Sequence, residues 1–132
     1  MNRRNETLTP MRDLLKRIAI PDFNVDSYLS GAENNSHAVP NVGLAFSGGG
    51  YRAMLCGAGQ LAALDSRSSG SDASGNLGGL LQSATYISGL SGGAWLLGSL
   101  YTNNFTTVEQ NLNSGAVWQL QDSILSGESE LG

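Results

Sequence analysis

The chain has 132 residues, of which 40% are hydrophobic, and this length allows one domain with a modest core. Its net charge of −4 comes without any basic patch, which argues against a nucleic-acid partner. No run of eighteen apolar residues is present to span a membrane, the single cysteine cannot form an internal disulfide, and no Cys/His grouping has the spacing of a metal site.

The first third of the chain is predicted to form a helix, a connection and a strand. Apolar residues near helical spacing predict a short amphipathic helix from about Thr9 to Ile20, which Pro21 stops. The polar stretch Asp22–Pro40 is interpreted as a surface connection. The apolar run Asn41–Ser47 is short and is followed by three glycines, which predicts a buried strand.

A glycine turn and a helix follow this strand. The helix is predicted over Tyr51–Leu64, where strong helix formers and small residues dominate. Within it, Cys56 is expected to be a buried and inert thiol. The Ser/Gly/Asp-rich stretch Asp65–Asn76 predicts a loop, and an apolar element begins over Leu77–Gln82.

The unit of strand, glycine turn and helix then repeats. Ser83–Gly89 predicts a second buried strand, and Gly92–Tyr101 predicts the helix after it. A further helix is expected over Val108–Leu125, with these candidate buried positions: Val117, Trp118, Leu120, Ile124 and Leu125. Two such units in succession predict an α/β fold, with a parallel or mixed central sheet flanked by helices.

The second glycine turn has the pattern G-x-S-x-G, Gly89-Leu90-Ser91-Gly92-Gly93, between a predicted strand and a predicted helix. A nucleophilic serine needs this kind of sharp turn, and small neighbours let strand and helix pack closely. The N–H of Gly92 at the helix N-terminus would face the oxygen that becomes negative in acyl transfer. The alternative is a purely structural turn in a chain rich in glycine and serine.

The first glycine turn, Ser47-Gly48-Gly49-Gly50-Tyr51-Arg52, places several N–H groups at a helix N-terminus. Such a turn can hold either a phosphate or an oxyanion. It lacks the register of a dinucleotide-binding fingerprint and the Gly-Lys-Ser/Thr of a P-loop, so no nucleotide cofactor is expected. Arg52 either reaches a bound phosphate or faces solvent.

A general base for the serine is not evident in the sequence. The only histidine, His37, lies in a polar connection and is interpreted as a surface residue. Asp65, Asp72 and Asp122 lie in polar loops or helices without a glycine turn. Without a base, Ser91 would keep an ordinary hydroxyl, so the chain alone is expected to have little hydrolase activity.

Together, Ser47–Met54 and Gly89–Trp95 resemble the paired motifs of fungal lysophospholipases (phospholipase B), relatives of the cytosolic group IV phospholipase A2 catalytic domain. The resemblance implies a serine–aspartate dyad that hydrolyses acyl esters of lysophospholipids, and possibly of phospholipids, at a membrane or micelle surface without a cofactor. Ser91 matches the nucleophile, Gly49 and Gly50 match the oxyanion-hole glycines with Gly92 as a further donor, and Arg52 matches the phosphate-binding arginine. The family's aspartate lies in an Asp-Gly-Gly-like setting, and no Asp-Gly occurs here.

The resemblance also implies that residues 1–132 form the N-terminal portion of a larger catalytic domain. Patatin-like lipases share both kinds of turn and are the alternative family, and a non-catalytic module that binds phosphate or a head group is the alternative function. Family members are secreted or cell-surface glycoproteins, whereas this N-terminus lacks the apolar region of a signal peptide. Three glycosylation sequons agree with secretion, at Asn5, Asn34 and Asn104.

Overall fold

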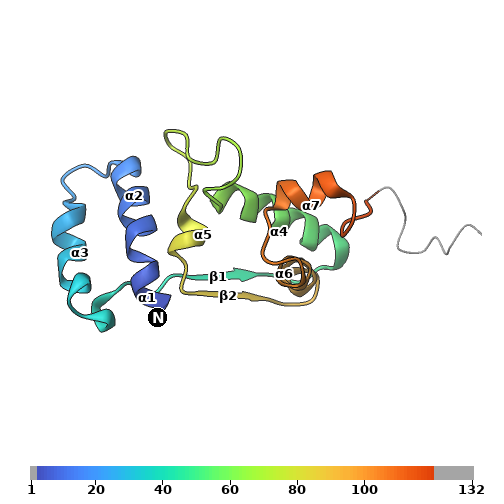
Figure 1. Cartoon of the computed structure of the whole chain (residues 1–132), viewed down its shortest axis with the longest axis horizontal. Coiled ribbons are helices and arrows are strands. Elements are labelled where there is room, and N and C mark those ends of the chain that lie inside the picture. Colours follow the sequence, from blue (N-terminus) through green and yellow to red (C-terminus); the bar gives the residue numbers. More distant parts are fainter. Residues whose placement is uncertain (1–2, 121–132) are drawn as a thin grey trace, which may run out of the picture.

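The computed structural model describes residues 3–120 as a mixed α/β fold with a small parallel sheet. In chain order the elements are α1 Arg3–Glu6, α2 Leu8–Ile18, α3 Val25–Glu33, the 3-10 helix η1 Ser36–Ala38, β1 Gly43–Phe46, α4 Gly50–Leu64, α5 Leu80–Ser83, β2 Tyr86–Gly89, α6 Gly92–Thr102 and α7 Val108–Ser114 (Figure 1). The predicted fold class is therefore confirmed, and both predicted units of strand, turn and helix are present.

The two strands pair in parallel, with a register that runs from Gly43 opposite Tyr86 to Phe46 opposite Gly89. Parallel neighbours need a long crossover, which here consists of α4, the loop after it and α5. Figure 1 shows both strand arrows pointing toward α6, so the two strands end at the same edge of the sheet. Each glycine turn begins at that edge.

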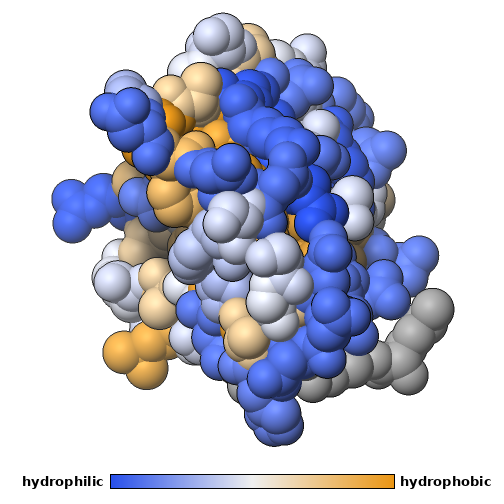
Figure 2. All heavy atoms as spheres, turned by 90° about the vertical axis from the view of Figure 1, so that its left-hand side faces the viewer, coloured by the Kyte–Doolittle hydropathy of each residue, from blue (hydrophilic) through white to orange (hydrophobic). Residues whose placement is uncertain are grey.

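One face of the sheet packs on the main core, to which Phe46 of β1 and Leu96 and Leu100 of α6 contribute. α4 packs against α6, and Met54, Ala58 and Leu61 supply its buried side. A second core lies between α2 and α3, whose outer surface is largely hydrophilic (Figure 2). None of the helices in residues 3–120 has the length and apolarity needed to cross a membrane.

The prediction of two buried strands is wrong for the described residues. Phe46 is the only buried residue of the two strands, and the side that carries Gly43, Ala45, Tyr86 and Ser88 is exposed. Parallel strands are usually covered on both faces. Here residues 3–120 supply cover for one face only.

The interpretation of Asp22–Pro40 as a connection is also wrong, because α3 and η1 lie within it. Asn24 caps α3 by accepting a hydrogen bond from the backbone N–H of Ser27 at 2.8 Å. Val25, Leu29 and Ala32 then line one buried face of the helix. Because the segment is polar overall, its sequence does not predict this face of three apolar residues.

Three further boundaries or environments differ from the predictions. α2 ends at Ile18 rather than at Ile20, because Ala19 already adopts a left-handed conformation with φ of 51°. Cys56 is exposed rather than buried, since α4 turns the opposite side toward the core. α7 ends at Ser114 because Gly115 is left-handed.

The candidate buried positions beyond α7 have mixed outcomes. Trp118 is buried and Val117 is partly buried against the main core, whereas Leu120 is exposed. Ile124 and Leu125 lie outside the described residues.

Candidate active site

The parallel sheet brings the two glycine turns side by side. The backbone N–H of Leu90 donates to the carbonyl oxygen of Phe46 at 3.0 Å, which continues the pairing beyond the strand ends. A Cβ atom placed on Gly48 would lie 3.0 Å from Cβ of Ser91 and 3.6 Å from its Oγ. The glycine turn after β1 therefore runs directly beside the Ser91 side chain, and any side chain at position 48 would press on it.

Ser91 itself has a strained backbone. Its φ of 50° and ψ of −117° lie outside the regions that residues with a Cβ normally adopt. Such strain costs on the order of 1–3 kcal/mol and gathers at functional sites. Ser91 precedes α6, is exposed and makes no side-chain cap for the helix, and its hydroxyl has no hydrogen-bond partner within residues 3–120. A sharp strained turn with a free serine hydroxyl has the form of a nucleophile elbow.

The glycines around Ser91 are required by close backbone contacts. A Cβ on Gly89 would lie 2.5 Å from the carbonyl oxygen of Gly93, so a side chain there would collide with the start of α6. A Cβ on Gly92 would lie 2.0 Å from the carbonyl oxygen of Gly50, and one on Gly93 would lie 2.3 Å from that of Phe46. These contacts hold the N-terminus of α6 against both β1 and the first turn of α4.

Two helix N-termini consequently meet beside Ser91. Gly50 is the first residue of α4 and Gly92 the first of α6, while Gly49 caps α4 with φ of 135°. The first N–H groups of a helix have no partner within the helix, and the aligned peptide dipoles add partial positive charge there. The region around Ser91 thus offers amide donors and a positive potential to a negatively charged oxygen.

Arg52 lies in the first turn of α4, close to the same helix N-terminus. Its side chain is exposed, and its guanidinium makes no ion pair or hydrogen bond within the described part of the chain. By contrast, Arg12 pairs with Asp26 and Glu33, and Arg67 pairs with Asp65. An unpaired arginine beside two helix N-termini is suited to bind an anionic group.

The structure does not bring His37 to this site. His37 lies in η1, before β1 begins, and it is exposed as predicted. Ser91 lies beyond the opposite ends of the strands. A four-residue strand is about 13 Å long, so the histidine is separated from the serine by at least the length of the sheet.

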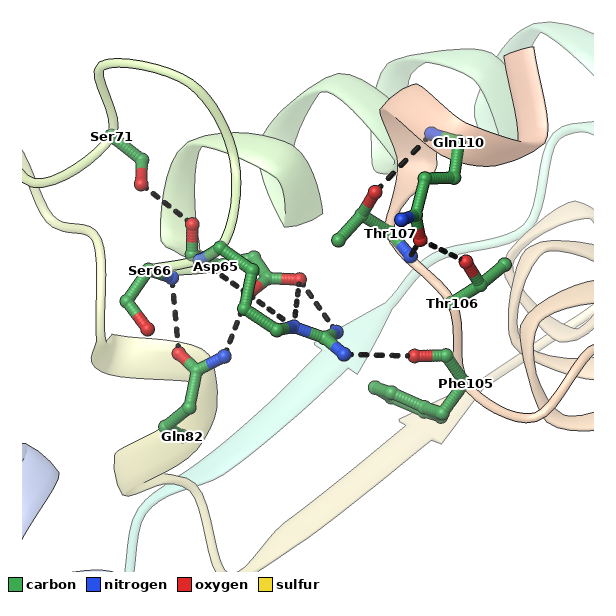
Figure 3. Close-up of polar contacts among 9 residues, drawn as sticks. Asp65, Ser66, Ser71, Gln82, Phe105, Thr106, Thr107 and Gln110 are labelled. Atoms are coloured by element: carbon green, nitrogen blue, oxygen red, sulfur yellow. Dashed lines mark hydrogen bonds and ion pairs between the residues drawn. The ribbon is translucent and has the colours of Figure 1, made fainter. Parts of the chain in front are cut away.

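Asp65 is buried but is already engaged elsewhere. Figure 3 shows it at the centre of a cluster with Gln82 and the carbonyl of Phe105. Arg67 donates to its two carboxylate oxygens, from Nη2 at 2.7 Å and from Nε at 2.9 Å. Gln82 Nε2 donates at 2.6 Å, and Arg67 Nη1 reaches the carbonyl of Phe105 at 3.1 Å.

The hydrogen bonds of this cluster favour the ionised carboxylate of Asp65 and give the residue a structural role. Burial alone raises the pKa of Asp65, but hydrogen bonds from the side chain and backbone of Arg67 and from Gln82 outweigh it and hold the pKa below its ordinary value. Asp65 follows the last residue of the fifteen-residue helix α4. It therefore lies about 20 Å from the turn at Gly50. It anchors the loop after α4 and cannot serve Ser91 as a base.

The sequence does not predict this cluster. Asp65 and Arg67 lie in a polar stretch, and polarity alone predicts only a loop there. Asp65 and Arg67 are two residues apart, which is the one local signal of a pair. A cavity of about 650 Å³ lies beside Arg67, and it is lined by residues of α5, of β2 and of the link between them, and by Tyr101 and Phe105. Ser91 does not line that cavity. Within residues 3–120, no three His, Cys, Asp or Glu side chains gather as metal ligands would.

The three sequon asparagines differ in their local structure. Asn5 lies within α1, Asn34 follows the last residue of α3, and Asn104 lies in a turn with φ of 57°. All three residues are exposed.

The chain is similar to several known proteins. Residues 42–131 match the family described as the lysophospholipase catalytic domain. A lysophospholipase of Penicillium chrysogenum is 53% identical over 127 residues, which cover 95% of this chain and 21% of that protein. Lysophospholipase 2 of Aspergillus fumigatus is 51% identical over 97% of this chain and 22% of its own length.

A more distant relative has a similar extent of match. A lysophospholipase of Torulaspora delbrueckii is 45% identical over 91% of this chain and 19% of its own length. The chain thus spans about a fifth of the length of the curated relatives it matches. No solved structure matches the chain significantly.

Proposed function

The chain belongs to the family of the lysophospholipase catalytic domain, and on that premise we propose that the protein hydrolyses the acyl ester of lysophospholipids with Ser91 as nucleophile. The proposal includes phospholipids with two acyl chains as further substrates. The observation that carries the proposal is the strained backbone of Ser91, held by close glycine contacts beside two helix N-termini. The family match of residues 42–131 favours this group over patatin-like lipases.

In the proposed reaction, Ser91 Oγ attacks the ester carbonyl and its proton passes to a base. The carbonyl oxygen becomes negative and accepts hydrogen bonds from backbone N–H groups of Gly49, Gly50 and Gly92. The glycerophospho-alcohol then leaves with a proton, and an acyl-serine remains. Water hydrolyses that ester, which releases the fatty acid and restores the hydroxyl. Arg52 binds the phosphate of the head group during acylation, until the glycerophospho-alcohol leaves.

The base is the part of the mechanism that residues 3–120 do not supply. Asp65 is committed to Arg67, and His37 lies beyond the far end of the sheet. The resemblance to lysophospholipases implies an aspartate partner, and no Asp-Gly-Gly occurs in these 132 residues. We therefore propose that the 132-residue chain by itself has little or no hydrolase activity.

A fluorophosphonate probe, which reacts with activated serines, tests the nucleophile directly in the complete protein. Wild-type protein is expected to be labelled and to release fatty acid from lysophosphatidylcholine, and Ser91→Ala is expected to lose both. Ser88→Ala is a matched control, because Ser88 is an exposed serine of β2, three residues before Ser91. Equal labelling of Ser91→Ala and wild type would refute the proposal.

A second candidate function is favoured by the guanidinium of Arg52, which has no partner within residues 3–120. In this alternative, the chain is a module that binds a phosphate or phospholipid head group without chemistry. Binding of glycerophosphocholine would then survive Ser91→Ala and be lost in Arg52→Ala, with no fatty acid released by any variant. Turnover that depends on Ser91 contradicts this alternative.

We further propose that the protein is secreted or displayed at the cell surface and carries N-linked glycans. Asn34 and Asn104 are the favoured acceptors, because they are exposed outside regular helix. Asn5 lies within α1, which makes it a poorer acceptor. Glycosidase treatment of protein from a secreting fungal host should reduce its mass, and Asn34→Gln with Asn104→Gln should remove most of that shift.

A further inference from the structure

Both polar and apolar groups lie close to Ser91. Gly49, Gly50 and Arg52 lie at the N-terminus of α4, and Arg52 has no partner within residues 3–120. Leu90 directly precedes Ser91, and the backbone N–H of Trp95, one helical turn later, donates to the carbonyl of Ser91 at 2.9 Å. Leu90 is 72% exposed and Trp95 is 53% exposed.

Two hydrogen bonds hold the backbone of Leu90 in place. Its N–H donates to the carbonyl of Phe46, and its own carbonyl accepts from the N–H of Gly93 at 2.9 Å. Both of its backbone groups are therefore fixed within the turn that carries Ser91. At 72%, its side chain has the largest exposed fraction among the large hydrophobic residues of the described chain. A rigid, exposed leucine next to a nucleophile is a surface that an apolar ligand can cover.

The composition of α6 indicates that its outer side is also covered. The helix carries no charged residue, and its inner face is buried through Leu96, Leu97 and Leu100. Its outer side begins next to Ser91 and is formed by Ala94, Trp95, Gly98 and Tyr101, all exposed. A helix that is apolar on every side is normally buried on every side.

We infer that Leu90 and Trp95 form the contact surface for the acyl chain of the substrate and set its preferred length. This inference rests on the proposed function. The scissile carbonyl of a lysophospholipid separates an anionic phosphate from a hydrocarbon chain. With the carbonyl at Ser91 and the phosphate at Arg52, the exposed side chains of Leu90 and Trp95 are the apolar groups next to Ser91 that the acyl chain can cover.

The test measures kcat/KM of the complete protein on lysophosphatidylcholines with 6 to 16 acyl carbons, kept below the concentrations at which they form micelles. In wild type, kcat/KM should rise about fourfold for each methylene that becomes buried, until the surface is filled. Leu90→Ala and Trp95→Ala should flatten this rise, with a loss of tenfold or more at the longest chains that shrinks as the chain shortens. Trp95→Phe should restore most of the slope.

Leu112→Ala is the matched control, because Leu112 is an exposed leucine on α7. Its chain-length profile should equal that of wild type, and melting temperatures should show that all variants are folded. Unchanged profiles in Leu90→Ala and Trp95→Ala would overturn the inference while leaving the proposed function intact. Absence of Ser91-dependent turnover in wild type would instead refute the proposed function.

Two other occupants of this surface are distinguishable outcomes that also overturn the inference. A surface that docks on membranes predicts that Leu90→Ala weakens binding to phosphatidylcholine vesicles and leaves the monomer chain-length profile unchanged. A surface that packs against another part of the protein predicts that Leu90→Ala and Trp95→Ala lower the melting temperature and reduce kcat/KM equally at every chain length.

Discussion

Gly93 and Gly98 lie in the same helix, α6, and the structure predicts opposite effects for the same substitution at the two positions. A Cβ on Gly93 would lie 2.3 Å from the carbonyl oxygen of Phe46, whereas a Cβ on Gly98 would have nothing within 4 Å. Alanine favours a helix interior over glycine by about 1 kcal/mol. Since both variants gain this term and change the unfolded chain equally, their difference isolates the close contact at Gly93.

The magnitude follows from how far Phe46 must move. An ordinary contact begins near 3.4 Å, so its carbonyl oxygen must withdraw by about 1.1 Å (3.4 − 2.3). That oxygen also accepts the hydrogen bond from Leu90. Overpacking costs about 1–3 kcal/mol and a lost hydrogen bond about 1 kcal/mol. We expect Gly93→Ala to lose about 2 kcal/mol net and Gly98→Ala to gain about 1 kcal/mol.

Urea unfolding followed by circular dichroism measures this difference of about 3 kcal/mol. It corresponds to about 12 °C in melting temperature for a domain of this size. Similar slopes against urea in both variants show that the same surface is exposed on unfolding. If Gly93→Ala is as stable as Gly98→Ala, the close approach of α6 to β1 is wrong, and with it the placement of Ser91.

Three other predictions concern the site and the Asp65 cluster. Ser91→Gly should abolish fluorophosphonate labelling yet raise the free energy of unfolding by about 1 kcal/mol, because glycine adopts a positive φ without strain; a loss of stability in denaturant unfolding would contradict the strain. Asp65→Asn should lower stability by about 2 kcal/mol at pH 7. Because the folded pKa of Asp65 is depressed, its stabilisation is present above the ordinary pKa and lost as the pH falls through the folded pKa. Thermal melts at pH 7 and pH 3 should therefore show a smaller gap between Asp65→Asn and wild type in acid, with Asp72→Asn as control, because Asp72 is exposed and makes no ion pair within residues 3–120. Arg52→Ala should raise KM for lysophosphatidylcholine tenfold or more and affect a neutral ester much less, and equal effects on both substrates would exclude a phosphate contact.

The sequence predicts the repeated unit of strand, turn and helix because each part carries a strong local signal. Apolar runs end in glycines, and the next residues favour helix. The bounds of α4 and α6 accordingly agree with prediction to within one residue. By contrast, α3 is not evident from the sequence, because polar residues such as Asp26 and Ser27 separate its three buried apolar residues. These apolar residues become a buried face only because α2 packs against them.

Whether a single residue is buried, and what it contacts, is harder to predict than the helix or strand to which it belongs. Cys56 has apolar neighbours on both sides in sequence, but which side of α4 faces the core depends on α6. The Asp65 cluster joins α4, the loop after it, α5 and the turn before α7. No local pattern encodes contacts across so many elements, whereas the packing of Gly93 on Phe46 can be anticipated from the G-x-S-x-G turn itself.

The strain at Ser91 and the glycine contacts around it are two parts of one arrangement. A serine with φ of 50° would relax unless its neighbours prevented it. Gly92 and Gly93 press against Gly50 and Phe46, and Gly48 lies against the serine side chain, so neither side of the turn is free to move. A Cβ at any of these glycines would disrupt the close packing around the turn. This packing therefore keeps Ser91 strained and exposed. Stability and reactivity are coupled through the same few backbone atoms.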